Sequence, residues 1–315
     1  MKDVLQTLEG WNAKGLRFAT ATVVKVERSA PLPPGAVLAV SEEGEVAGSV
    51  TGGCVEPAVY EEAQDVLGGG PPRLVTYGIA DEEAFEVGLP WGGTVHIFLG
   101  MAERDLVEEL AAAVKSERPV ALATEISGPD IGAQRLVELN GHFEAAIEGD
   151  TFFLPFGPRP EMYIFGAVDH AAAIGRIGKF LGYRVTICDA RGRFATRERF
   201  PDVDEVVVQW PDEFLRNAPV DERTAICVLT HDHKFDVPLL KVALETPASY
   251  IGAMGAKKTT EARNERLLAE GVTDEQLERI HAPIGLRIGS RTPEEVAVAV
   301  AAEIVATRRK AGVPA

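Results

Sequence analysis

A cysteine follows two glycines at Gly52, Gly53 and Cys54, directly before a stretch with the pattern of a helix. The two glycines permit a sharp turn and leave room for a ligand close to the backbone. A cysteine at the start of a helix faces the positive end of the helix dipole and open N–H groups, and both favour the thiolate. The sequence therefore predicts either a reactive thiol, which could contact a metal centre or carry sulfur, or a small buried residue at a tight turn.

Glu56 lies two residues after this cysteine, within the first turn of the expected helix. Its negative charge opposes formation of a thiolate, but its carboxylate could accept a proton there. We therefore name Cys54 and Glu56 as the candidate catalytic residues.

An incomplete dinucleotide-binding motif follows the apolar segment MYIFG, where Gly166 to Ala171 read GAVDHA. Val168 replaces the glycine that lets a pyrophosphate approach the backbone, which argues against ordinary NAD binding. Asp189 lies 23 residues after Gly166, where a ribose-binding carboxylate belongs, and a turn residue at a strand end is the alternative.

Polar residues follow two further predicted strands. His231, Asp232 and His233 come after the strand 224–230, and the segment Gly252–Lys258 comes after the strand 248–251. Carboxyl ends of parallel strands form the edge at which α/β sheets bind ligands. A glycine-rich loop that opens a helix, with Lys257 in its first turn, predicts an anion cradle. The two histidines could instead ligate a metal, although no third ligand accompanies them at a recognised spacing.

Strands alternate with helices after about residue 160, which predicts a doubly wound parallel sheet. The helices are expected over residues 171–181, 237–244, 257–269 and 294–308. The preceding part reads as an α+β domain, with a helix over 55–67 and a hairpin that joins 135–139 to 142–147 through Asn140-Gly141. The proline-containing segment Thr151–Glu161 marks the boundary, so we expect domains at 1–155 and 156–315.

Composition restricts the class of partner. The chain has 315 residues and a formal net charge of -16, which argues against nucleic-acid binding. Its longest apolar run, Val296–Ala302, is too short to cross a bilayer, and Met1–Gly15 has no signal-peptide core. Cys188 and Cys227 lie in apolar stretches typical of a core, and we expect three reduced thiols in a cytoplasmic protein without a membrane partner.

Several segments together, in this order, resemble the XdhC/CoxI family. They are GSVTGGCVEPAVYEEA at 48–63, YIFGAVDHAAAIGRIGKFLGYRVTICDAR, LTHDHKFD, YIGAMGAKKT and HAPIGLRIGSRTPEEVAVAVAAEI. The resemblance implies an accessory protein that binds the molybdenum cofactor (molybdopterin), presents it to a cysteine desulfurase for sulfuration and inserts it into an apo molybdenum hydroxylase, such as xanthine dehydrogenase or carbon monoxide dehydrogenase. It implies an N-terminal α+β domain followed by a Rossmann-like domain.

The resemblance also maps site residues onto this chain. The family's GGC cysteine corresponds to Cys54, the expected contact to molybdenum, and its acidic residue to Glu56. Family members often carry a second cysteine where this chain reads Pro90-Trp91, so Cys54 would act alone. The cofactor-binding residues that we expect are Gly52, Gly53, Cys54, Gly166, His170, Asp189, Arg191, His231, Asp232, His233, Gly252, Gly255 and Lys257.

Three functions remain open from the sequence. The first is a chaperone that delivers the cofactor rather than turning over a substrate, binds it in a crevice between the domains and can form a homodimer. The second is an NAD(P)-dependent oxidoreductase that uses the Rossmann domain. The third is a metal-dependent hydrolase that uses His231 and His233.

Overall fold

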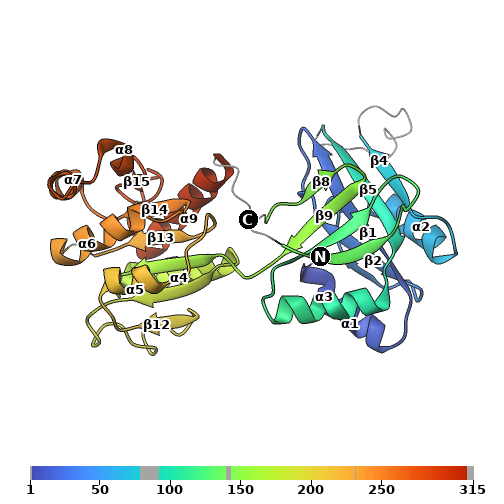
Figure 1. Ribbon diagram of the computed structural model, residues 1–315, viewed down its shortest axis with the longest axis horizontal. Helices are drawn as coiled ribbons and strands as arrows, with labels where there is room; N and C mark the ends of the chain where they lie inside the picture. The colour runs from blue at the N-terminus through green and yellow to red at the C-terminus, as the bar shows by residue number, and fades with distance from the viewer. Residues whose placement is uncertain (1, 79–91, 140–142, 231, 311–315) are drawn as a thin grey trace. The chain divides into compact units, whose positions relative to one another are not determined.

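The computed structural model of the chain describes residues 2–78, 92–139, 143–230 and 232–310. The chain divides into two compact units, Met1–Pro158 and Arg159–Ala315 (Figure 1). Within the described ranges no helix is both long and apolar enough to cross a bilayer.

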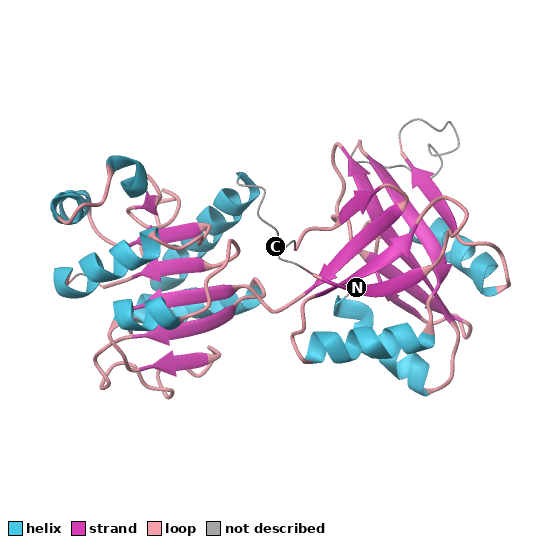
Figure 2. Cartoon of the chain, in the orientation of Figure 1, coloured by secondary structure: helices cyan, strands magenta, loops and turns pink. Residues whose placement is uncertain are grey.

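The first unit contains a five-stranded antiparallel sheet, shown as magenta arrows in Figure 2. Its order is β3 (Val46–Gly48), β2 (Val37–Ser41), β1 (Phe18–Glu27), β5 (Thr94–Met101) and β4 (Arg73–Tyr77). Helix α2 (Glu56–Leu67) packs on one face of this sheet through Val59, Ala63 and Val66. On the other face, α1 (Lys2–Ala13) and α3 (Arg104–Lys115) share a core with the second sheet of this unit.

The second sheet of this unit has the order β7 (Gln134–Glu138), β6 (Val120–Glu125), β9 (Thr151–Phe156) and β8 (Ala146–Glu148). The predicted hairpin between residues 135–139 and 142–147 is wrong, because β8 pairs with β9 and β7 pairs with β6. Thr151–Phe156 is not a linker either. Its side chains alternate between buried and half-buried positions, which places Phe152, Leu154 and Phe156 in the core.

The second unit is a six-stranded parallel sheet with the strand order of dinucleotide-binding folds. The order is β12 (Glu205–Val207), β11 (Arg184–Cys188), β10 (Glu161–Phe165), β13 (Ala225–Val228), β14 (Tyr250–Ala253) and β15 (Ile280–His281). Along β10, Met162 and Ile164 face α4 (Asp169–Phe180) and α9 (Pro293–Lys310), and Tyr163 and Phe165 face α5 (Pro211–Asn217) and α6 (His233–Leu244). The predicted α+β domain followed by a Rossmann-like domain is confirmed.

Two element ends differ from the expectation in ways that move site residues. Strand β14 continues through Ala253, so Gly252 lies in the sheet rather than in the loop before α7 (Lys257–Ala269). Helix α6 begins at His233, four residues before the predicted start, so this histidine is helical. The short elements α5 and α8 (Asp274–Leu277) were not expected from the sequence pattern.

Candidate functional site

The turn before α2 places Cys54 at the edge of the first unit's core. Gly52 and Gly53 have φ angles of +81° and +122°, which L side chains rarely adopt, and in the described parts of the chain no atom beyond the adjacent residues lies within 4 Å of a Cβ built at either position. These two glycines are therefore required by the backbone path and not by close packing. Val55, the N-cap residue of α2, is buried, whereas Cys54 is half-buried against the same core.

The carboxylate of Glu56 organises this turn. It accepts hydrogen bonds from four consecutive backbone N–H groups, those of residues 50, 51, 52 and 53, at 2.8–3.1 Å. It also accepts from the hydroxyls of Ser49 at 2.5 Å and Thr51 at 2.8 Å. A ring of backbone N–H groups of this kind binds anions, and here the protein's own carboxylate fills it.

These contacts favour a positioning role for Glu56 over the proton-acceptor role expected from the sequence. Burial alone would raise the pKa of Glu56, but the hydrogen bonds from Ser49 and Thr51 outweigh it and lower the pKa to about 2. A carboxylate with so low a pKa is a weak base at neutral pH. Because the turn's N–H groups already hold Glu56, they offer no cradle for a second anion.

The other two cysteines are core residues, as predicted. Cys188 in β11 and Cys227 in β13 are both buried, and burial raises the pKa of each thiol to about 12. Cys54 is therefore the most accessible of the three thiols.

In the second unit the carboxyl ends of β10 and β13 approach each other at Gly166. This glycine has φ of +111°, and a Cβ there would lie 2.9 Å from Thr230 Cγ2. The N–H of Leu229 donates to Phe165 O at 2.8 Å, which joins the two strand ends. Gly166 is thus required by the close approach of the strands at the point where the strand order reverses, the usual ligand edge of such sheets.

Asp189 is 2% exposed, and protein groups contact both of its carboxylate oxygens. Oδ2 accepts from the N–H of Ala167 and from Arg191 Nη2, at 2.8 and 2.7 Å. Oδ1 accepts from the backbone N–H and Nε of Arg191, both at 2.9 Å. Burial would raise the pKa of Asp189, but these hydrogen bonds lower it overall. The carboxylate ties the turn after β10 to the end of β11, which favours the turn role over ribose binding.

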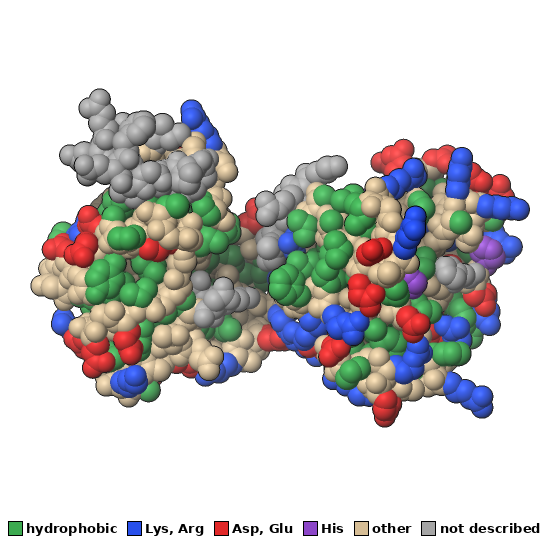
Figure 3. Space-filling model, turned by 180° about the vertical axis from the view of Figure 1, so that it is seen from behind, with side chains coloured by type: hydrophobic (Ala, Val, Ile, Leu, Met, Phe, Trp, Pro, Cys, Tyr) green, Lys and Arg blue, Asp and Glu red, His purple; other side chains and the backbone are tan. Residues whose placement is uncertain are grey.

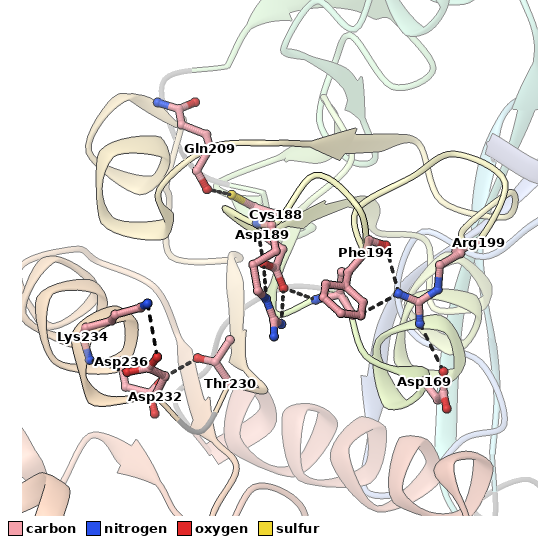
Figure 4. A network of polar contacts seen from close by, with 12 residues as sticks. Asp169, Cys188, Asp189, Phe194, Arg199, Gln209, Thr230, Asp232, Lys234 and Asp236 are labelled. Atoms are coloured by element: carbon pink, nitrogen blue, oxygen red, sulfur yellow. Dashed lines mark hydrogen bonds and ion pairs between the residues drawn. The ribbon is translucent and has the colours of Figure 1, made fainter.

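Arg191 is the more accessible member of this pair, with its side chain 46% exposed. Its guanidinium lies 4.8 Å from the ring centroid of Phe194, which holds the cation at the edge of the sheet. His170 is half-buried in the first turn of α4, next to Asp169, which forms an ion pair with Arg199. Figure 4 shows Asp189, Phe194, Arg199 and Asp169 at this edge.

The edge beside β13 brings only some of the predicted residues together. Asp232 is the N-cap of α6 and accepts from the N–H of Lys234 at 3.1 Å. His233 is half-buried, and its Nδ1 is buried. His231 lies outside the described residues. Among the described residues no group of three or more His, Cys, Asp or Glu side chains could hold a metal.

The Gly252–Lys258 segment divides between packing and solvent. Gly252 is buried in β14, where a Cβ would lie 2.6 Å from both Ile284 Cγ1 and the hydroxyl of Tyr250. Close packing within the sheet therefore explains why this position is glycine, and its contact with a ligand stays a prediction. The Lys257 side chain is 92% exposed beside Glu261. Gly255, just before α7, has a φ angle of +150°, a backbone conformation that requires glycine.

Sequence reasoning missed three polar residues that shape these two sites. Ser49 and Thr51 bond to Glu56, and a serine or threonine before a glycine turn is a signal that could have identified them. Asp236, 1% exposed, accepts from the hydroxyl of Thr230 (Figure 4). The sequence signal for Asp236 is an acidic residue within an apolar helical stretch, because a carboxylate buried there needs hydrogen-bond partners.

Comparisons with known proteins match both units of the chain. Residues 11–78 match the XdhC and CoxI family, and residues 162–304 match the XdhC Rossmann domain, so the two matches together cover more than half of the chain. The chain is 26% identical over 319 residues to a protein of Bacillus subtilis named as a probable xanthine dehydrogenase component, covering 93% of this chain and 94% of that protein. It is 28% identical over 288 residues to the molybdenum cofactor insertion chaperone PaoD of Escherichia coli, covering 91% and 82%.

A crystal structure described as a xanthine dehydrogenase from Bacillus halodurans has the same fold. Its TM-score is 0.73 at 23% identity, and the match covers 97% of this chain and 96% of that one. Both units thus have counterparts in known proteins, and the resemblance seen in the motifs is confirmed. This chain belongs to the XdhC and CoxI family.

Proposed function

We propose that this protein binds the molybdenum cofactor, holds it for sulfuration by a cysteine desulfurase and delivers it to an apo molybdenum hydroxylase of the xanthine dehydrogenase type. The cofactor is cargo, so the chain acts by binding and release. The names of its relatives support handling of this cofactor and association with such a hydroxylase. The reduced state required of Cys54 fits delivery in the cytoplasm.

One observation carries the proposal: a half-exposed thiol at the end of a turn that the protein's own carboxylate holds in shape. Thiolate is a soft ligand, and transition metals that prefer soft ligands bind it. The turn fixes where Cys54 stands, so the thiol need not lose much conformational entropy when it meets the cargo. We assign Cys54 the contact to molybdenum or to its exchangeable ligand, and Glu56 the positioning of that thiol.

The second unit supplies polar groups at the carboxyl edge of its sheet, and Arg191 is an accessible cation there. An oxidoreductase would need Asp189 to hold a ribose, but protein groups contact both oxygens of this carboxylate. Val168 further crowds the turn that a pyrophosphate would approach. These contacts favour cofactor delivery over NAD(P)-dependent turnover.

Activation of an apo molybdenum hydroxylase tests this function. The purified protein, molybdenum cofactor and a cysteine desulfurase with cysteine are mixed with apo-hydroxylase, and hydroxylase activity is followed with time. We expect wild type and Cys188→Ala to support activation, because both keep Cys54, and Cys54→Ser to fail. Equal activation by wild type and Cys54→Ser would contradict the thiol role, and activation that is the same without any added protein would contradict delivery.

A further inference from the structure

The adjoining ends of β13 and β14 carry buried polar groups that the proposed function has not used. The N–H of Met254 donates to Val228 O at 2.8 Å, which brings the segments after both strands together. Helix α6 begins after one of these strands and α7 after the other, and the two helices contact each other. This edge of the sheet therefore carries the first turns of both α6 and α7.

Arg263, in α7, is a buried cation with open donors at this edge. It is 0% exposed and is the largest of the fully buried side chains among the described residues. Its Nη1 donates to Met254 O at 3.0 Å, but its Nε and Nη2 are buried and find no hydrogen-bond partner in the described parts of the chain. Burial lowers the pKa of Arg263, and the nearby charge of Asp236 opposes that change. A buried guanidinium with unpaired N–H groups is costly, so these donors call for an acceptor.

Thr260 lies three residues before Arg263 on the same face of α7. Within the described ranges its hydroxyl is also buried and unpartnered, as is Nδ1 of His233 at the first residue of α6. A Cβ at Gly255 would lie 3.7 Å from Thr260 Oγ1, so a side chain at this position would stand beside the hydroxyl. Such a Cβ would be in ordinary van der Waals contact with Thr259 and Thr260, so glycine is favoured here by its φ of +150° rather than by space.

The first turn of α7 likewise combines positive charge with N–H groups that no side chain caps. Its N-cap, Ala256, makes no side-chain cap, and its first turn contains no acidic residue. Lys257 and Lys258 stand there instead, at the end of the helix where positive charge is unfavourable. Open backbone N–H groups, two lysines and a buried arginine form a concentration of donors that an anion would satisfy.

We propose that this edge is a phosphate-binding subsite, in which Arg263 and Thr260 donate to the phosphate oxygens and the first turn of α7 supplies its N–H groups. The assignment of that phosphate to the molybdenum cofactor rests on the proposed function, whereas phosphate binding rests on the geometry alone. Because Arg263 is fully covered, the phosphate reaches its nitrogens by displacing the side chains over them. Figure 3 shows acidic and basic side chains interspersed on the visible face of this unit, and the proposed subsite adds a buried cation, Arg263.

Calorimetric titration of the full-length protein tests the subsite. The probes are glycerol 3-phosphate, a terminal monoester, and NAD, whose diphosphate is a diester, with chloride at equal ionic strength as the salt control. Arg263→Met removes the guanidinium, and the matched control Arg266→Met removes an exposed one on the same helix. We expect wild type and Arg266→Met to bind one of the phosphate probes, and Arg263→Met to bind it on the order of 100-fold more weakly.

A gentler variant keeps the test valid if Arg263→Met folds poorly. Thr260→Val preserves side-chain shape and removes one donor, so we expect about tenfold weaker binding of the same probe. Preference for glycerol 3-phosphate would indicate a terminal phosphate in the natural ligand, and preference for NAD a bridging diphosphate. Binding that is equal in wild type, Arg263→Met and Thr260→Val, or absent from wild type, would overturn the subsite.

Molybdenum retention by Arg263→Met separates the two proposals. If phosphate binding is lost and molybdenum retention falls with it, the subsite holds the cofactor's phosphate. If phosphate binding is lost while molybdenum is retained as in wild type, the assignment to the cofactor is wrong and the proposed function stands. If wild type binds the phosphate probe but retains no molybdenum, the proposed function fails and the subsite stands.

Discussion

Glu56 accepts hydrogen bonds from four consecutive backbone N–H groups, and this contact set decides what the residue can do. Its place in the first turn of a helix suggested proton transfer, because residue type and spacing do not reveal that the preceding turn folds back over the carboxylate. With a pKa of about 2, Glu56 stays ionised at neutral pH and keeps the Cys54 turn in one shape.

Glu56→Gln should destabilise the first unit by about 2 kcal/mol, because the amide has one acceptor oxygen and its NH₂ group would face N–H donors. The pKa of Glu56 is lowered in the folded state from 4.5 to about 2. Its contribution to stability is therefore fully present above pH 4.5 and is lost as the pH falls toward 2. Urea unfolding of both proteins at several pH values measures this difference.

The matched control is Glu61→Gln, which changes an exposed residue of the same helix. It should unfold like wild type at each pH. If Glu56→Gln also matches wild type at neutral pH, the carboxylate does not hold the turn.

Alkylation should distinguish the three thiols. Cys54 is half-buried, whereas Cys188 and Cys227 are buried and have pKa values raised to about 12. Brief treatment of the native protein with iodoacetamide should modify Cys54 before the other two, and all three should react in denaturant. Peptide mass spectrometry locates the label. Faster labelling of Cys188 or Cys227 in the native protein would contradict the placement of the thiols.

At the scale of elements, local signals predicted the second unit better than the first. Strands β10 and β11 and helix α7 end within one or two residues of the expected positions, because apolar runs and polar helical stretches alternate there. The first unit depends on pairing between distant strands, which local patterns do not encode. Asn140-Gly141 suggested a hairpin, yet β8 pairs with β9, and the prolines after Thr151 concealed a core strand.

Gly166→Ala should push the ends of β10 and β13 apart. The residue has φ of +111°, and its new Cβ would lie 2.9 Å from Thr230 Cγ2. Backbone strain and the clash together should destabilise the second unit by at least about 2 kcal/mol. Gly192→Ala is the control, since its Cβ meets Val208 at an ordinary 3.4 Å. Thermal unfolding compares the two variants, and an equal melting temperature for both would show that the strand ends tolerate a side chain.

At the scale of the whole molecule, the chain consists of two units that each bury their own core. We expect each unit to unfold as a cooperative transition of its own. In differential scanning calorimetry of the full-length chain, Glu56→Gln should lower one transition and Gly166→Ala the other. A single transition that both variants lower equally would mean that the units unfold together.

The acidic charge and the ordinary globular composition set broad limits on partners, and the family motifs pointed to the cargo. The sequence could not predict that Arg263 and the Thr260 hydroxyl are buried together. An arginine in a polar helix is expected at the surface until the packing around it is known.

Molybdenum content after gel filtration tests the account most directly. The purified chain is incubated with extracted molybdenum cofactor, separated from free cofactor and analysed for metal per chain, with Cys54→Ser treated in parallel. The account predicts near-stoichiometric molybdenum on wild type and a strong loss on a Cys54→Ser protein that keeps its fold by circular dichroism. Equal molybdenum on both proteins, or none on wild type, would contradict it.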